Sequence, residues 1–397
     1  MAHPLRGAAA ITGLGITPMG RIYGKSAAEF AADAVRTAIA DAGLQREQID
    51  GLLINAGITG FSGGGLTLGL QNYLGLQNLR LLNHMNAAGS TAAQMVQYAT
   101  LAIHAGMARH VVCVFADVPL SEGSKASAAY GGGAARAQAR PKGMAGLYAA
   151  AGYFGANTGY ALAARRHMAL YGTKQEQFGA IAIGQRAWAG MNPLAQMREP
   201  MTMEDYHASR WVIEPLHLLD CCLVSNGAVA VIVSSAAEAK EMPQPPVYIH
   251  GMGQGHPGDP GRAGTDAETE TGAKIAAKTA FGMAGAGAAD ISQCQLYDCY
   301  TYTVLVTLED YGFCAKGEGG PFVEDGKLGP GGSLPTNTGG GELSAYYMWG
   351  MTPLSEAVIQ GRGAGGERQV KNDLILATGN GGTLAYHGAL ILSPHAN

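Results

Sequence analysis

Apolar residues fall along the chain in two patterns: short continuous runs, and longer segments in which they recur every three or four positions. The second pattern is clearest after residue 26, where Ser26 and Glu29 have the spacing of a capping box and Gly43 stops the helix. A helix is also predicted at residues 90–105, and strands are predicted at residues 8–11, 52–55, 79–82 and 111–116. Gly13 and Gly15 should close the first strand. This alternation predicts an α/β fold with a largely parallel sheet.

Residues 34–54 and 276–296 form an internal repeat that aligns without a gap. The six identical pairs are Ala34/Ala276, Thr37/Thr279, Ala38/Ala280, Ala42/Ala284, Gly43/Gly285 and Ile49/Ile291. Each copy reads as a helix, a glycine stop, a polar link and a strand, so two similar α/β halves should build the protein. We place the first half at residues 1–236, with a loop insertion at about 119–209, and the second at residues 242–397. The Pro-rich stretch at 242–246 marks the boundary.

Composition narrows the class of protein. The chain has 397 residues, 47% hydrophobic and 14% charged, which is typical of a globular protein with more than one core. The net charge of −4, without a run of like charges, argues against binding to nucleic acid or to an anionic membrane. The six cysteines include no C-x-x-C pair, so we expect no metal site and buried thiols in a reducing cytoplasm. The N-terminus lacks the pattern of a signal peptide, which also favours a cytoplasmic protein.

Candidate ligand-binding residues cluster at predicted strand ends and in the turns that follow them. Four such segments lie at residues 83–90, 297–302, 337–347 and 378–383, and three of them are rich in Gly, Asn and small residues. In a duplicated α/β fold the ends of strands from both halves meet, so these segments should line one site. Turns of this composition bring backbone N–H groups close to a ligand.

Several motifs carry a family resemblance. The opening segment 11–20, Ile-Thr-Gly-Leu-Gly-Ile-Thr-Pro-Met-Gly, resembles the start of the thiolases linked to sterol carrier protein. Further similar motifs are Asp41-Ala-Gly43 with Ile49-Asp50-Gly51, Asn192-Pro193, and the stretch from Pro215 through Asp220 to Ala228. The resemblance spans essentially the whole chain. It implies a thiolase-like fold of two duplicated α/β halves, with mixed, largely parallel sheets in an α-β-α-β-α layering, and a homodimer.

The reactive positions depart from the thiolase pattern. Asn86 stands where those enzymes have the nucleophilic cysteine, in Asn83-His-Met-Asn86-Ala-Ala-Gly89-Ser90. Tyr297 replaces the histidine of a His-Asp-Cys-Phe motif, and Tyr347 replaces the histidine of a Gly-His-Pro motif. These replacements resemble the steroid side-chain-cleaving retro-aldolases, which use two tyrosines. That resemblance implies a small OB-fold, zinc-containing partner subunit in a heterotetramer, and a coenzyme A thioester as substrate without a further cofactor. It also implies that the insertion covers the active site. The Gly/Ala-rich composition of the first part of the insertion suggests a mobile lid or a partner surface.

The chemistry of these residues favours a retro-aldol reaction. Asparagine cannot carry an acyl group as a thiolate does. Retro-aldol cleavage needs instead a base for the β-hydroxyl, an oxyanion hole and a proton donor for the enolate. Tyrosine has an ordinary pKa of about 10, so Tyr297 and Tyr347 should be coupled to each other or to water.

The oxyanion or substrate-binding candidates are Asn86 and the backbone around Gly340, Gly341 and Gly381, with Asp298, Glu342 and Tyr346 as further candidates. Each also has a structural reading. The tyrosines could pack in a core, Asn86 could cap a turn, and Glu342 could be an exposed carboxylate at a helix start. Asp298 could orient the turn beside Tyr297, and Tyr346 could replace Tyr347 if the alignment is offset by one. We interpret His84, His387 and Cys299 as structural.

Three functions remain open. The first is retro-aldol cleavage of a β-hydroxyacyl-CoA, such as a steroid or bile-acid side chain, to a ketone or aldehyde and propionyl-CoA or acetyl-CoA. The second is a cysteine-independent acyl-CoA acyltransferase or thiolase. The third is a non-catalytic acyl-CoA-binding or lipid-binding subunit. Gly13, Gly15 and Gly20 do not have the spacing of a dinucleotide fingerprint, so nicotinamide binding is rejected.

Overall fold

The computed structural model describes residues 3–55, 57, 66–126, 143–153, 155–257 and 269–396. Residues 127–142, which form the Gly/Ala-rich first part of the expected insertion, lie outside the described residues, as do residues 1–2 at the N-terminus.

The described strands form one nine-stranded sheet and a separate two-stranded hairpin of β5 and β6. The order in the large sheet is β3-β2-β4-β7-β1-β8-β11-β10-β9. The strands are β1 (Ala9–Ile16), β2 (Gly51–Asn55), β3 (Leu81–His84), β4 (His110–Asp117), β5 (Trp211–Ile213), β6 (Leu216–His217), β7 (Gly227–Ser235), β8 (Val247–Gly255), β9 (Gln293–Gln295), β10 (Ile375–Gly381) and β11 (Tyr386–Ser393).

The sheet is mixed, as the α/β prediction requires. The pairs β2–β3, β2–β4 and β9–β10 are parallel. The other five neighbouring pairs are antiparallel, so antiparallel pairs outnumber parallel ones among the described strands. The expected parallel ladders therefore lie at the outer strands. In the large sheet, the strands before the stretch at 242–246 (β1, β2, β3, β4 and β7) lie on one side, and the strands after it (β8 to β11) lie on the other. The two groups meet where β1 pairs with β8.

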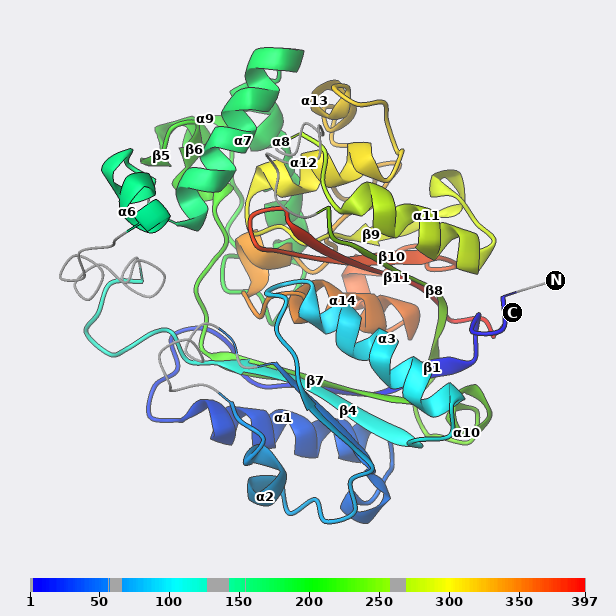
Figure 1. Cartoon of the computed structure of the whole chain (residues 1–397). Coiled ribbons are helices and arrows are strands. Elements are labelled where there is room, and N and C mark those ends of the chain that lie inside the picture. The colour runs from blue at the N-terminus through cyan, green and yellow to red at the C-terminus, as the bar shows by residue number, and fades with distance from the viewer. Residues whose placement is uncertain are drawn as a thin grey trace.

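Helices and strands stack in five layers (Figure 1). From the bottom of that view these are α1 and α2, the strands β1, β4 and β7, the helices α3 and α14, the strands β8, β10 and β11, and finally α11 and α12. The helices are α1 (Ala27–Asp41), α2 (Leu70–Leu74), α3 (Thr91–His104), α6 (Gly143–Ala150), α7 (Ala156–Tyr171), α8 (Gln175–Gly190), α9 (Met203–Ala208), α10 (Ala236–Ala239), α11 (Ala273–Ala284), α12 (Thr301–Asp310), α13 (Gly319–Phe322) and α14 (Met351–Gly361).

The two copies of the sequence repeat have the same local structure. Helix α1 and helix α11 both end before a glycine with left-handed backbone, Gly43 at φ +67° and Gly285 at φ +63°. A short 3-10 turn follows in each copy, η1 (Arg46–Gln48) and η4 (Ala288–Asp290), and then β2 or β9. The alignment without a gap therefore carries through from helix to strand.

Gly13 and Gly15 do not end the first strand, because β1 continues to Ile16. A Cβ atom at Gly15 would lie 2.0 Å from the Ala34 carbonyl oxygen, and one at Gly13 would lie 2.5 Å from that of Ala38. These glycines let α1 lie directly on the strand. The second half repeats this packing, since a Cβ atom at Gly253 would lie 2.1 Å from the carbonyl oxygen of Ala276, the repeat partner of Ala34.

The start of α1 confirms the predicted capping box. The Ser26 N–H donates to Glu29 Oε2 at 2.7 Å, and the Glu29 N–H donates to Ser26 Oγ at 3.3 Å. Phe30, Ala34 and Val35 are buried on the face predicted from their spacing. The other predicted strands and the helix at 90–105 are found as β2, β3, β4 and α3, with ends shifted by a few residues.

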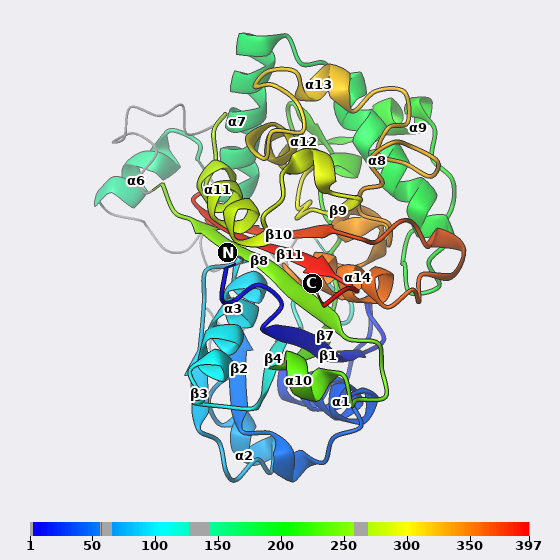
Figure 2. The ribbon, with the colours of Figure 1, turned by 90° about the vertical axis from the view of Figure 1, so that its right-hand side faces the viewer.

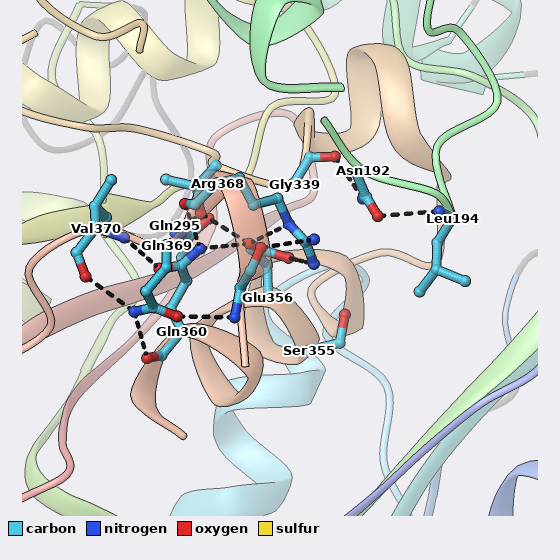
Figure 3. A network of polar contacts seen from close by, with 12 residues as sticks. Asn192, Leu194, Gln295, Gly339, Ser355, Glu356, Gln360, Arg368, Gln369 and Val370 are labelled. Carbon is cyan, nitrogen blue, oxygen red and sulfur yellow. Dashed lines mark hydrogen bonds and ion pairs between the residues drawn. The ribbon is translucent and has the colours of Figure 1, made fainter. Parts of the chain in front are cut away.

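A buried ionic network supports the turn before residue 340 (Figure 3). Glu356 on α14 accepts from Arg368 Nε at 3.0 Å and from Gln360 Nε2 at 3.0 Å. It also accepts from the Thr338 hydroxyl at 2.9 Å. Because both members of the ion pair are buried and fully bonded, this network holds the 337–341 turn against α14.

Helices α7, α8 and α9 of the insertion lie over the second half, near α12 and α13 (Figure 2). Within the helices that the structure describes, none has both the length and the apolar character needed to cross a membrane.

Candidate active site

Two phenol groups meet in the second half of the chain. The Tyr297 and Tyr347 hydroxyl oxygens lie 2.8 Å apart, and their ring centroids are 6.4 Å apart at 61°. Tyr297 follows β9 in the turn before α12, and Tyr347 lies in the turn before α14. The structure therefore brings together two residues that are 50 positions apart in the sequence.

Two side-chain hydroxyl groups hold the backbone of this pair. The Tyr297 N–H donates to Thr378 Oγ1 at 3.1 Å, and the Tyr347 N–H donates to Ser225 Oγ at 3.1 Å. Thr378 belongs to β10, and Ser225 directly precedes the Asn226-Gly-Ala motif, which leads into β7. Elements of both halves thus fix the two tyrosines.

The pair is buried, which disfavours a charge on Tyr297. Tyr297 and Tyr347 are only 4% and 9% exposed. Burial raises the pKa of Tyr297 well above its ordinary value, the nearby Glu342 carboxyl raises it further, and the hydrogen bond from Tyr347 opposes the shift. A resting phenolate on Tyr297 is therefore disfavoured.

Tyr346 points elsewhere. Its hydroxyl lies 2.8 Å from Ser355 Oγ on α14, and burial raises its pKa to about 12. Of the two neighbouring tyrosines that the motif left open, Tyr347 rather than Tyr346 bonds to Tyr297.

Asp298 fastens the turn of Tyr297 to the glycine-rich turn. Its carboxylate accepts from the Glu342 N–H at 2.9 Å and from the Leu343 N–H at 3.1 Å. Burial raises the pKa of Asp298 to about 7, against the effect of these hydrogen bonds. Glu342 and Leu343 belong to η5 (Gly341–Ala345), a single π-helical turn, and such turns are frequent at functional sites.

Glu342 is not the exposed helix-start carboxylate that one reading of the sequence predicted. Its side chain is fully buried, because the turn after Gly340 folds inward between the loops of Tyr297 and Cys222. Within the described part of the chain, neither carboxyl oxygen has a hydrogen-bond partner.

The turn of Asn86 matches the turn of Tyr347. Ala88 and Trp349 both have φ +50°, two positions after Asn86 and Tyr347 respectively. The N–H of the residue after each donates to a helix-start threonine, Ala87 to Thr91 Oγ1 at 2.7 Å and Met348 to Thr352 Oγ1 at 2.9 Å. Asn86 and Tyr347 thus occupy equivalent positions in two equivalent turns.

Asn86 itself is exposed and acts within its turn. Its side-chain carbonyl accepts from the Ala88 N–H at 3.1 Å. In the described part of the chain, no hydrogen bond joins it to the tyrosine pair. The geometry thus favours the turn-capping reading of this residue.

The three candidate glycines allow close packing. The Gly340 N–H already donates to the Asn337 carbonyl at 2.8 Å, so it is used by its own turn. A Cβ atom at Gly341 would lie 2.2 Å from Asp298 Oδ2, and one at Gly381 would lie 2.5 Å from the Ala87 carbonyl oxygen. Gly341 therefore admits Asp298, and Gly381 supports the turn of Asn86.

Two further polar residues of the site were not predicted from the sequence. Asn380 Nδ2 donates to the Tyr160 hydroxyl at 3.3 Å, while Asn380 Oδ1 is buried without a partner in the described chain. Tyr160 on α7 packs on Tyr300, with ring centroids 4.5 Å apart. The one sequence signal for Asn380 was the Gly- and Asn-rich segment at 378–383, which we interpreted only as a source of backbone N–H groups.

The residues interpreted as structural lie outside the pair. His387 is buried, its Nε2 lies 2.9 Å from the Tyr311 hydroxyl, and burial lowers its pKa to about 3. His84 is exposed at the end of β3. Cys299 is buried beside Tyr160, and burial raises the pKa of its thiol. Among the described residues, no group of three or more His, Cys, Asp or Glu side chains could hold a metal ion.

The arrangement supports proton transfer. Two hydrogen-bonded neutral phenols can accept a proton at one oxygen and release one at the other. The turn that bears the nucleophilic cysteine in thiolases has no cysteine here, so the site lacks the means to form an acyl enzyme at that position.

Comparison with known proteins gives consistent results. A family described as "Thiolase C-terminal domain-like" matches residues 253–394. The "Steroid side-chain-cleaving aldolase" of Thermomonospora curvata is 37% identical over 383 residues, covering 94% of this chain and 95% of that protein. The "17-hydroxy-3-oxo-4-pregnene-20-carboxyl-CoA lyase" of Mycobacterium tuberculosis is 34% identical over 378 residues, covering 90% and 92%. A solved structure titled "Ltp2-ChsH2(DUF35) aldolase" superposes with a TM-score of 0.85 at 34% identity, covering 98% of each chain.

Proposed function

Because this chain belongs to the family of the steroid side-chain-cleaving aldolases, within the thiolase superfamily, we propose that it cleaves a β-hydroxyacyl coenzyme A thioester by a retro-aldol reaction. The observation that carries this proposal is the 2.8 Å hydrogen bond between the phenols of Tyr297 and Tyr347. The products are a ketone or aldehyde and a short acyl-CoA.

The hydrogen-bonded phenols form a proton relay. The β-hydroxyl proton passes to one phenol oxygen, and its O–H electron pair becomes part of the new C=O bond. The Cα–Cβ bond breaks, and its electron pair becomes the thioester enolate. The first phenol passes its own proton to the second, which protonates the α-carbon. Each tyrosine ends the cycle as it began, so no other reactant is consumed and no resting phenolate is needed.

A thiolase or acyltransferase reaction is less well supported. All six cysteines are free, and burial raises the pKa of the two nearest the site, Cys222 and Cys299, well above the ordinary value of a thiol. A thiolate is the reactive form, so these sulfurs are poor nucleophiles. The hydrogen-bonded phenols of Tyr297 and Tyr347 instead suit proton transfer.

The names of the relatives suggest the substrate class. A steroid with a 20-carboxyl-CoA group and a 17-hydroxyl carries that hydroxyl β to the thioester carbonyl, which is the pattern that a retro-aldol step requires. We therefore propose a 17-hydroxysteroid CoA thioester as substrate for this chain. Cleavage between carbons 17 and 20 would release a 17-ketosteroid and propionyl-CoA.

The proposed assembly is a homodimer joined by a small OB-fold, zinc-containing partner into a heterotetramer. The solved aldolase structure that superposes on this chain is named for two components, Ltp2 and ChsH2(DUF35), which supports a partner subunit. We propose a cytoplasmic site of action, where the six thiols would stay reduced.

Product analysis tests this function. The protein, alone and with co-purified partners, is incubated with a panel of β-hydroxyacyl-CoAs, and mass spectrometry quantifies ketones and acyl-CoAs. Equimolar ketone and short acyl-CoA support retro-aldol cleavage. Turnover that requires free CoA, with a trapped acyl-cysteine, would establish a thiolase instead. Tight binding without turnover in every assembly would establish a lipid-binding subunit.

A further inference from the structure

Glu342 differs from every other buried acid in the described part of the chain. The others are Asp117, Asp220, Asp298, Glu309, Asp310 and Glu356, and each accepts at least one hydrogen bond or ion pair through its carboxyl group. Glu342 is 0% exposed, and both its carboxyl oxygens lack any such partner. A buried polar group left unpaired is unfavourable, so its retention calls for a function or a ligand.

The backbone of Glu342 is rigidly held. Its N–H donates to Asp298, and its carbonyl accepts from the Leu223 N–H at 2.9 Å. Gly340 at φ +96° and Gly341 at φ +61° turn the chain inward just before it. The side chain is thus fixed in place by groups that do not satisfy its own carboxyl.

The groups around this carboxyl would oppose a negative charge on it. A charge on Glu342 raises the pKa of Tyr297, Tyr160, Cys299 and Cys222, so its carboxyl lies within electrostatic reach of all four. Asp298 adds a second acid, and burial with that acid raises the pKa of Glu342 well above its ordinary value, against a smaller opposing effect of the Asp298 backbone N–H.

In the described part of the chain, no cationic side chain lowers the pKa of Glu342. Arg186 of α8 reaches this turn, but its Nε donates to Ser344 Oγ at 2.9 Å. Burial and these neighbours therefore favour the protonated acid, whose O–H has no acceptor among the described residues.

We propose that Glu342 works as a neutral carboxylic acid whose O–H donates a hydrogen bond to the enolate oxygen formed during cleavage. This inference rests on the proposed function. The acid keeps its proton throughout, and the tyrosine pair moves the protons. The enolate oxygen supplies the acceptor that the carboxyl lacks in the free protein, so the interaction strengthens as charge develops, which is the requirement for transition-state stabilisation. A neutral acid held in an apolar site and donating to a steroid enolate is a known catalytic device.

Two substitutions at this position separate a donor from a base. Glu342→Gln keeps a hydrogen-bond donor of the same shape and should retain kcat within about tenfold. Glu342→Leu removes the donor and should lower kcat about 10²–10³-fold, with KM little changed, as for the loss of one oxyanion-hole donor. The exposed Glu367→Gln serves as a control and should match the wild type. Equal impairment of the Gln and Leu variants would overturn the proposal, because it would indicate an ionised carboxylate. Wild-type rates in both would overturn it equally.

Infrared spectroscopy tests the same claim without turnover. At neutral pH the difference spectrum of wild type minus Glu342→Gln should show the C=O stretching band of a protonated carboxylic acid, because the band of Asp298, whose pKa is raised to about 7, cancels in the difference. Absence of the band from the difference spectrum contradicts the neutral state even if the Leu variant does not fold. If the band is present but the wild type cleaves no β-hydroxyacyl-CoA, the proposed function fails while the neutral acid stands.

Discussion

Gly89 and Tyr297 are packed so closely that a Cβ atom at residue 89 would lie 2.2 Å from the ring carbon Cε2 of Tyr297. The same atom would lie 2.3 Å from the Asn380 carbonyl oxygen. Gly89 lies in the turn that carries the nucleophilic cysteine in thiolases. It therefore sets the position of the Tyr297 phenol, which comes from the other half of the chain.

Gly89→Ala should displace the Tyr297 ring, because the strand carbonyl on the other side cannot yield. We expect kcat to fall about 10²-fold through misplacement of the reacting group, and stability to fall by about 1–3 kcal/mol through overpacking. Steady-state kinetics and urea unfolding measure the two effects.

A matched control for that variant is Gly282→Ala in α11, where no atom lies within 4 Å of the added carbon. Alanine in a helix interior should stabilise the protein by about 0.5–1 kcal/mol and leave kcat unchanged. Unaltered kinetics in both variants would show that the contact with Tyr297 does not matter.

Tyr346→Phe and Tyr347→Phe form a neighbouring pair with opposite expectations. Removal of the Tyr347 hydroxyl breaks the bond to Tyr297 and should lower kcat about 10²–10⁴-fold. Removal of the Tyr346 hydroxyl breaks only the bond to Ser355, and should cost about 1 kcal/mol of stability with kcat retained. Kinetics that reverse this order would move the reactive position by one residue.

Asp298→Asn should loosen the junction between the turns of Tyr297 and Glu342. The carboxylate accepts two backbone N–H groups, and an amide cannot accept with its nitrogen. We expect a loss of about 1–3 kcal/mol in the free energy of unfolding, because a buried backbone N–H group is left without its acceptor. Asp373→Asn at the surface is the control, and a comparable loss there would contradict the assignment.

The pH dependence of stability should change in Glu342→Gln. Burial raises the pKa of Glu342 in the folded protein above that in the unfolded chain, so its favourable contribution is complete below the unfolded value and is lost as the pH rises. The free energy of unfolding of the Gln variant should therefore gain on the wild type by up to about 1.4 kcal/mol per pH unit above about pH 4.5. Parallel curves for the two proteins between about pH 5 and about pH 8 would rule out a buried neutral acid.

Local patterns in the sequence predicted much of the fold. The capping box of α1 and the repeat of helix, glycine and strand depend on neighbouring residues, and both are found. Gly13 and Gly15 were misread because their role depends on α1 crossing the strand, which a turn-based interpretation does not consider.

The site was only partly predictable for a similar reason. Tyr297 and Tyr347 were identified by their place in motifs, whereas Asn380 and Tyr160 meet through β10 and α7, which are far apart in the chain. The burial of Glu342 depends on Gly340 and Gly341 turning inward, and on Asp298 holding the next N–H groups. Neither condition is visible in the local sequence, where a glutamate after glycines resembles an exposed helix start.

The most direct test of the central claim is cleavage in D2O without free CoA. The protein, with any partners that co-purify, is given a 17-hydroxysteroid CoA thioester, and the acyl-CoA product is examined for deuterium. The tyrosine relay predicts ketone and short acyl-CoA in equal amounts, one deuterium on the α-carbon, and loss of both products by about 10²-fold or more in Tyr297→Phe and in Tyr347→Phe. Dependence on added CoA, an acyl-CoA without deuterium, or full activity of both phenylalanine variants would contradict it.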